Sequence, residues 1–234
     1  MNRFPNIDRA AEACGAFILE KLNEAIAQRG RATLAISGGS SPRAMFEFFA
    51  RAQAEKMADW QKIQLFCVDE RGVPPTDPQS NFKLANDHWL APAKYPVANL
   101  HRIHAELDAA EAARKYTDEI RSTFGVVPGD VPVFDVIHQG MGPDAHTASL
   151  FPGEPLIDDR RGIAAAVWVE KMHQWRITML PAVLLAARHT VMLVAGADKA
   201  GILKEVLEGP YEPKKYPVQL VARNAIDVSW FIDF

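Results

Sequence analysis

The stretch Val133-Phe134-Asp135-Val136-Ile137 is followed by Gly140-Met141-Gly142-Pro143-Asp144-Ala145-His146-Thr147-Ala148-Ser149-Leu150-Phe151-Pro152. A largely apolar run that ends in a glycine-rich turn is typical of a strand leaving a sheet. Glycine lets the backbone approach a ligand closely, and Asp144 and His146 add titratable groups. We therefore predict a strand over residues 133–137 and a catalytic loop over residues 140–152, in which Thr147 or Ser149 caps a following helix.

The order of strand, polar turn and helix recurs in three other places. Strands are predicted over residues 33–36, 63–68 and 190–194, and each runs into a polar or glycine-containing segment before a helical pattern. These segments are Ser37-Gly38-Gly39-Ser40-Ser41-Pro42, Asp69-Glu70-Arg71 with the later Ser80-Asn81, and Ala195-Gly196-Ala197-Asp198-Lys199. Alternating strands and helices predict a largely parallel sheet that is covered on both faces.

The remaining elements are read from shorter patterns. Apolar spacing predicts a helix over residues 7–29 that stops at Gly30, and further helices over residues 82–90, 108–124 and 181–187. We predict a strand over residues 164–169, a last buried strand over residues 218–221 and an edge strand over residues 228–234.

Composition limits the kind of protein this is. The chain has 234 residues, of which 48% are hydrophobic, enough for one domain over residues 1–234 without a metal or disulfide. The formal charge is -3, with 26 basic and 29 acidic residues, so no nucleic-acid or membrane partner is expected. A small-molecule ligand is favoured, with Cys14 and Cys67 reduced and buried. No stretch of the sequence resembles a leader or is long and apolar enough to span a bilayer, so we expect the protein to lie in the cytoplasm.

The four polar segments are expected to form one site. Ligands of open parallel sheets bind outside the carboxyl ends of the strands, which all lie at one edge. The predicted site combines a possible anion-binding loop, cations and one imidazole, from residues 37–41, Asp69, Arg71, Asp144, His146 and Lys199.

The loop of residues 37–42 suits a phosphate group. Glycines expose backbone N–H groups, the serine hydroxyls donate, and Pro42 begins a helix whose positive end faces the anion. The loop lacks the G-x-x-x-x-G-K-[ST] and G-x-G-x-x-G patterns, which disfavours ATP and dinucleotides. An ordinary strand-to-helix turn is the alternative.

Two cations support an anionic ligand, and each has a plainer alternative. Arg71 suits a developing oxyanion or a phosphate, or it forms an ion pair with Asp69 or Glu70. Lys199 is in a first helical turn, which the helix dipole disfavours for a cation unless an anion binds there, or it is simply solvated.

The other histidines have mostly structural explanations. His138 is in the predicted strand or at its end. For His173, near Lys171 and Arg176, the sequence favours neither a structural nor a functional role. No H-E-x-x-H or paired Cys/His spacing occurs, so no metal is expected.

Together, these motifs resemble those of the 6-phosphogluconolactonase family. The resemblance rests on the loop of residues 37–42, Asp69-Glu70-Arg71, Ser80-Asn81, residues 140–152, Arg176-Ile177-Thr178 and residues 196–199. It implies a three-layer α/β/α sandwich, a modified Rossmann-like fold with a largely parallel sheet and an antiparallel edge. The implied reaction is hydrolysis of 6-phosphogluconolactone to 6-phosphogluconate in one sugar-phosphate lactonase domain, without a cofactor and as a monomer or homodimer.

The resemblance also implies roles for single residues. His146 would activate water as the general base, Arg71 would stabilise the developing negative charge, and Asp144 would orient His146 or bind a sugar hydroxyl. The substrate-binding residues would be Ser37, Gly38, Gly39, Ser40, Asp69, Asn81, Arg176 and Lys199.

The sequence departs from the family pattern at three points. Ala145 stands where glycine is usual, so we predict an ordinary negative φ there. Ser41 replaces a threonine, and Met172-His173 replaces prolines. One rival reading is a glucosamine-6-phosphate deaminase, for which Asn-Glu-Pro would stand in place of Leu150-Phe151-Pro152 and a tyrosine would follow Asp69-Glu70. The other is a non-catalytic sugar-phosphate sensor.

Overall fold

The main sheet is entirely parallel. The structure, a computed structural model, describes residues 1–39, 41–54 and 57–234, and within these residues seven strands pair in the order β1-β10-β9-β6-β2-β3-β5. The strands are β1 (Asn2–Arg3), β2 (Ala32–Ile36), β3 (Ile63–Cys67), β5 (Leu100–His101), β6 (Val136–Gln139), β9 (His189–Val194) and β10 (Val228–Ile232).

The antiparallel strands form a second sheet, not an edge of the first. In the described residues this sheet has three strands in the order β4-β8-β7: β4 (Asp69–Arg71), β8 (Gln174–Met179) and β7 (Ala164–Val169). Val68 joins the sheets, because its N–H donates to Ile36 at 2.8 Å and its carbonyl accepts from Met179 at 2.8 Å. The second sheet thus begins where β3 leaves the first.

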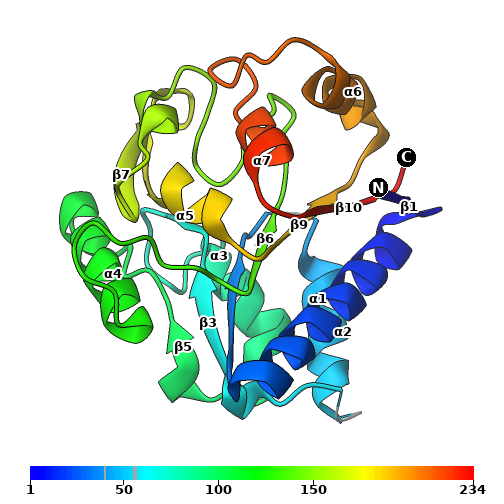
Figure 1. Cartoon of the computed structure of the whole chain (residues 1–234), viewed down its shortest axis with the longest axis vertical. Coiled ribbons are helices and arrows are strands. Elements are labelled where there is room, and N and C mark those ends of the chain that lie inside the picture. Colours follow the sequence, from blue (N-terminus) through cyan, green and yellow to red (C-terminus); the bar gives the residue numbers. More distant parts are fainter. Residues whose placement is uncertain (40, 55–56) are drawn as a thin grey trace.

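Helices cover both faces of the parallel sheet, as predicted (Figure 1). Along β2, β9 and β10 the apolar residues alternate between two clusters: Leu34 belongs to the cluster with α1 and α2, and Ala35 to the cluster on the opposite face. The helices are α1 (Ile7–Arg29), α2 (Arg43–Ala54), α3 (Asn81–Ala85), α4 (Ala109–Phe124), α5 (Pro181–Ala186), α6 (Ala200–Glu208) and α7 (Val218–Asn224). The α/β three-layer prediction is therefore confirmed.

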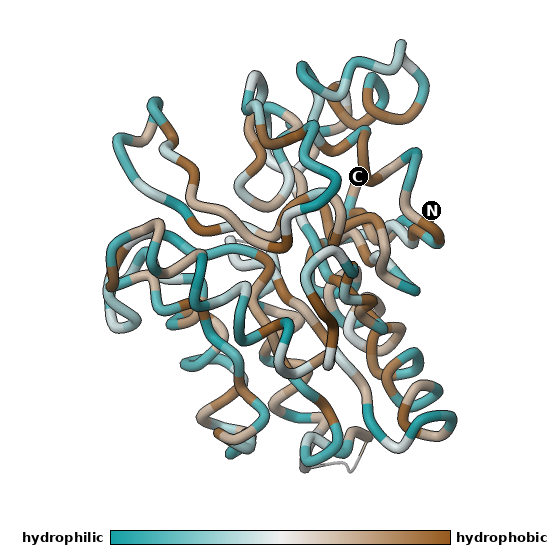
Figure 2. Tube along the Cα trace, turned by 60° about the vertical axis from the view of Figure 1, so that its left-hand side comes forward, coloured by the Kyte–Doolittle hydropathy of each residue, from teal (hydrophilic) through white to brown (hydrophobic). Residues whose placement is uncertain are grey.

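Helix α1 shows how local sequence fixes an element. Asn6 caps its first turn by accepting a bond from the Arg9 N–H at 3.0 Å, and Gly30 ends it with a φ of 77°. Its apolar face packs on the sheet, and in Figure 2 the central strands are mostly hydrophobic whereas outer loops are mostly hydrophilic. Among the described residues, no helix has the length and apolar character of a membrane span.

The predicted strand over residues 218–221 is wrong. These residues form helix α7, which starts at Val218 with Pro217 as its N-cap. The last segment forms β10 between β9 and β1 instead of an edge strand. Four consecutive buried side chains resemble a buried strand, and a short apolar run cannot distinguish the two. Gln219 is satisfied in the helix by donating to the carbonyls of Glu205 and Pro210.

One boundary and one whole strand also differ from the predictions. Strand β6 starts at Val136 instead of Val133, because Asp135 accepts bonds from the Thr33 N–H at 2.8 Å and from Arg29 at 2.6 Å. Strand β8 was not predicted, since its residues were read as the approach to helix α5. This omission matters, because β8 positions Arg176.

Candidate active site

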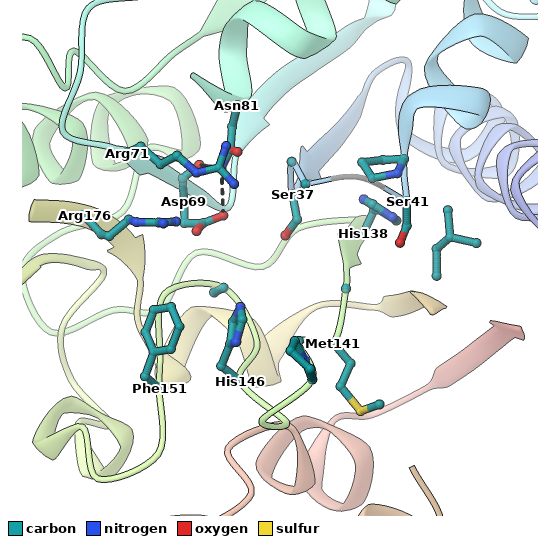
Figure 3. A pocket seen from close by; sticks show the side chains of 18 of the residues that line it. Ser37, Ser41, Asp69, Arg71, Asn81, His138, Met141, His146, Phe151 and Arg176 are labelled. Atoms are coloured by element: carbon teal, nitrogen blue, oxygen red, sulfur yellow. Dashed lines mark hydrogen bonds between the residues drawn. The ribbon is translucent and has the colours of Figure 1, made fainter. Parts of the chain in front are cut away.

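One pocket collects most of the predicted site residues at the carboxyl ends of the strands. It has a volume of about 270 Å³ and lies between the second sheet, residues 37–39, 41 and 42, and the loop of residues 140–152 (Figure 3). The predicted residues that line it are Ser37, Gly38, Gly39, Asp69, Arg71, Asn81, His146, Arg176 and Lys199. Asp144 lies just behind His146, and the prediction for Ser40 falls outside the described residues.

The catalytic loop has a strained backbone. Ala145 has a φ of 61°, so the prediction of a negative φ is wrong. Its conformation is fixed on both sides, because its N–H donates to Gly142 at 3.0 Å and its carbonyl accepts from Val218 at 2.9 Å. Ala148 also has a positive φ, of 51°. Such strain persists only where surrounding contacts impose it, and it is typical of functional sites.

The hydroxyls of the loop do not cap a helix, contrary to the prediction. Thr147 donates to the side chain of Gln139 at 2.9 Å and to the Gly140 carbonyl at 3.0 Å. Ser149 donates to the Asp69 carboxylate at 2.6 Å. No helix follows these two residues directly, so there is no helix for them to cap. Both hydroxyls instead connect the loop to the ends of β6 and β4.

His146 is held by contacts on several sides. Its Nδ1 lies 2.5 Å from Oδ1 of Asp144, and its ring stacks on Phe151 at a centroid distance of 4.2 Å. Gly142 leaves room for the ring, because a Cβ at that position would lie 2.0 Å from Cε1 of His146. With Nδ1 engaged by a carboxylate, Nε2 is the nitrogen left to accept a proton.

Asp144 also contacts Lys171, which lies between β7 and β8. Burial opposes the ionisation of Asp144, but hydrogen bonds from His146 and Lys171 outweigh burial and hold its pKa below the ordinary range. The carboxylate is therefore charged at neutral pH, and it favours the tautomer that has its proton on Nδ1 of His146.

Lys171→Met is expected to lower kcat by about two- to fivefold and the melting temperature by no more than a few degrees, because a half-exposed ion pair is worth about 1 kcal/mol at most. Steady-state kinetics and thermal unfolding measure the two effects, and Lys171→Arg should restore most of kcat. A wild-type kcat in Lys171→Met would show that Lys171 does not position Asp144.

Buried carboxylates order the opposite wall. Glu70 is 2% exposed and accepts bonds from the N–H groups of Arg71, Asn81 and Phe82 at 2.7, 2.7 and 2.8 Å. Burial raises the pKa of Glu70, and these hydrogen bonds oppose the shift. Glu70 thereby fixes the start of α3, from which Asn81 donates to the Asp69 carbonyl at 3.1 Å.

Two arginines lie side by side on this wall. Arg71 of β4 and Arg176 of β8 are cross-strand partners, and Figure 3 shows both beside Asp69. The predicted alternative of an ion pair from Arg71 to Asp69 or Glu70 is not seen, since its guanidinium donates to the Gln79 carbonyl. Burial and the nearby Arg71 lower the pKa of Arg176, and Asp69 opposes the shift. Its Nε has no partner among the described residues, an arrangement that favours an anionic ligand.

The third wall is formed by residues 37–39, 41 and 42. Gly39 has a φ of 101°, and a Cβ on Gly38 would lie 2.1 Å from Oδ1 of Asn81, so both glycines are needed there. Lys199 is the last residue of a short 3₁₀ turn (Ala197–Lys199) before α6. Burial lowers the pKa of Lys199, and no ion pair to it occurs within the described part of the chain. These are features of an anion-binding site.

Several contributors were missed by sequence reasoning. Lys171 contacts Asp144 through tertiary packing that no spacing reveals. Phe151 and Ser149 lie in the predicted catalytic loop, but their contacts with His146 and Asp69 were not predicted. Glu70 had a signal, because it lies within the Asp69-Glu70-Arg71 motif. In residues 1–39, 41–54 and 57–234, no three His, Cys, Asp or Glu side chains gather as metal ligands.

Comparison with known proteins identifies the family. Residues 5–230 match the family model described as glucosamine-6-phosphate isomerases/6-phosphogluconolactonase. The chain belongs to this family. It is 35% identical over 217 residues to a 6-phosphogluconolactonase of Synechocystis, covering 92% of this chain and 88% of the relative.

Solved structures of the family share the fold. A 6-phosphogluconolactonase from Shewanella baltica aligns with a TM-score of 0.87 at 25% identity, covering 100% of this chain and 97% of that one. A monomeric glucosamine-6-phosphate deaminase aligns with a TM-score of 0.82 at 18% identity, covering 99% and 96%. The fold is therefore common to both activities, and the site residues must separate them.

Proposed function

We propose that the protein hydrolyses 6-phospho-D-glucono-1,5-lactone to 6-phospho-D-gluconate, a reaction of the pentose phosphate pathway that needs no cofactor. The observation that carries the proposal is the pairing of His146 with Asp144 at 2.5 Å in a pocket that also contains Arg71 and Arg176. A general base and guanidinium groups in one pocket are the parts that ester hydrolysis requires. Family membership and the lactonase relatives support the same reaction.

The mechanism follows from the two nitrogens of His146. Nε2 removes a proton from water as the water oxygen attacks the lactone carbonyl, while Asp144 stabilises the imidazolium that forms. The carbonyl oxygen becomes an oxyanion, which Arg71 stabilises through its permanent charge. The intermediate then expels the ring oxygen, which takes the proton from Nε2 and becomes the hydroxyl of the open product.

Substrate binding is assigned to the remaining walls. The 6-phosphate is held by the N–H groups and hydroxyls of Ser37, Gly38, Gly39 and Ser40 together with Lys199 and Arg176. Asp69 and Asn81 are buried polar side chains, 5% and 7% exposed, and they bind the sugar hydroxyls. Asp144 acts through His146 instead of on the sugar, because both of its oxygens are already engaged.

A deaminase is the nearest alternative. That reading expects a carboxylate following the histidine, and this chain places the apolar ring of Phe151 against His146. It also expects a tyrosine where Arg71 stands. A phenyl ring cannot exchange protons with His146, which favours hydrolysis over ring opening and isomerisation.

One experiment distinguishes the three candidate functions. Wild-type protein is incubated with 6-phosphogluconolactone and, separately, with glucosamine 6-phosphate. We expect lactone loss well above the spontaneous rate and no ammonia. Ammonia release without lactone hydrolysis would establish the deaminase instead. Binding of 6-phosphogluconate with neither reaction would indicate a non-catalytic sensor.

The setting of this reaction follows from its substrate. A sugar-phosphate lactone is a small soluble metabolite, so we infer a cytoplasmic enzyme with no nucleic-acid or membrane partner, acting as a monomer or a homodimer. The near-balanced charge of -3 supports this assignment.

A further inference from the structure

His138 is a buried histidine with no assigned role. It lies near the end of β6, is 1% exposed, and lines the pocket together with Ser37 and Ser41. Its main chain is fixed, because its carbonyl accepts from the Ser37 N–H at 3.1 Å. Figure 3 shows its ring between Ser37 and Ser41, which belong to the loop that follows β2, called here the serine–glycine loop (described at residues 37–39, 41 and 42).

The ring is unsatisfied where it lies. Neither ring nitrogen has a hydrogen-bond partner among the described residues, and the buried hydroxyl oxygen of Ser37 has none either. Burial lowers the pKa of His138 to about 3, so the ring is neutral and has one N–H donor. Buried polar groups without partners are destabilising, and a leucine at this buried position would leave no ring nitrogen unsatisfied.

The surroundings indicate the missing partner. Ser37, Ser41, Gly38, Gly39 and the half-buried Lys199 line the same pocket and carry hydrogen-bond donors. A group that accepts from all of them at once is a phosphoryl group.

We propose that His138 is a substrate-binding residue, whose neutral ring donates its N–H to an oxygen of the phosphoryl group bound at the serine–glycine loop. The proposal rests on the proposed function for the identity of the phosphorylated substrate, but it concerns phosphate recognition and not the chemical step. On this proposal the buried imidazole lowers the stability of the free protein, and it gains its hydrogen-bond partner when the ligand binds.

Replacing His138 should therefore raise the stability of the protein and weaken its binding of phosphate. His138→Leu removes the unsatisfied group, so its melting temperature should equal or exceed that of the wild type. The same variant should raise KM for 6-phosphogluconolactone and the dissociation constant for inorganic phosphate by about tenfold or more, because a hydrogen bond to a charged group is lost. Its kcat should change little, since His146 is untouched.

Two further variants separate binding from packing. His138→Gln keeps a donor and should recover much of the affinity. His101→Leu is the matched control: His101 is bonded to Glu119 and Gln64 at 2.8 Å each and stacks on Phe66, away from the pocket. It should lower the melting temperature and leave KM unchanged.

The wild type provides a test that needs neither variants nor turnover. Titrating inorganic phosphate into ¹⁵N-histidine-labelled protein should shift the ring nitrogen signals of His138. Unchanged His138 signals at saturating phosphate, or wild-type phosphate affinity in His138→Leu, would overturn the proposal. A protein that hydrolyses no lactone but shows the shift would fail the proposed function and still support His138.

Discussion

Gly142→Ala is expected to lower kcat for lactone hydrolysis by about a hundredfold or more in a protein that remains folded. The added Cβ would lie 2.0 Å from Cε1 and 2.1 Å from Nδ1 of His146, far inside contact distance. The φ of Gly142 is not in the left-handed region, so the backbone accepts alanine and the imidazole must move. The movement separates Nδ1 from Asp144 and takes Nε2 away from the attacking water.

The matched control is Gly201→Ala in α6. No atom lies within 4 Å of a Cβ at this position, and its backbone is helical. Alanine there should leave kcat unchanged and stabilise the protein by about 0.5–1 kcal/mol. Comparable kcat values for Gly142→Ala and Gly201→Ala would show that the observed position of His146 is not the working one.

The sequence alone predicts which segments meet at the candidate site. Strand-to-helix turns predict that residues 37–42, Asp69, Arg71, His146 and Lys199 lie at one edge of a parallel sheet. The structure brings the described residues of this set into one pocket. This succeeded because carboxyl ends of parallel strands share an edge whatever the order of the strands. Strand order itself depends on packing between distant segments, and it was not predicted.

The errors have a common physical origin in tertiary contacts. Ala145 takes a positive φ because Gly142 and Val218 fix its peptide groups, and local preference alone favours the opposite sign. The wall formed by β8 was missed because residues 174–179 pair with β4 and β7, which no periodicity in β8 specifies. Lys171 reaches Asp144 only through that hairpin.

His146→Ala is expected to have the largest effect of any single change in the pocket. It removes the proton acceptor, and general-base catalysis typically contributes about 10²–10⁴-fold to a rate. Arg71, Arg176 and the serine–glycine loop remain in place, so binding of 6-phosphogluconate should stay within about threefold of the wild type. The side chain is partly exposed, and its removal should leave the protein folded.

The most direct test of the account is the rate of 6-phosphogluconolactone loss at neutral pH, with wild type and His146→Ala at equal concentration and with spontaneous hydrolysis subtracted. The account predicts rapid hydrolysis by the wild type and at least a hundredfold lower kcat in a folded variant that still binds 6-phosphogluconate. Equal rates for the two proteins would contradict the role of His146 as the general base.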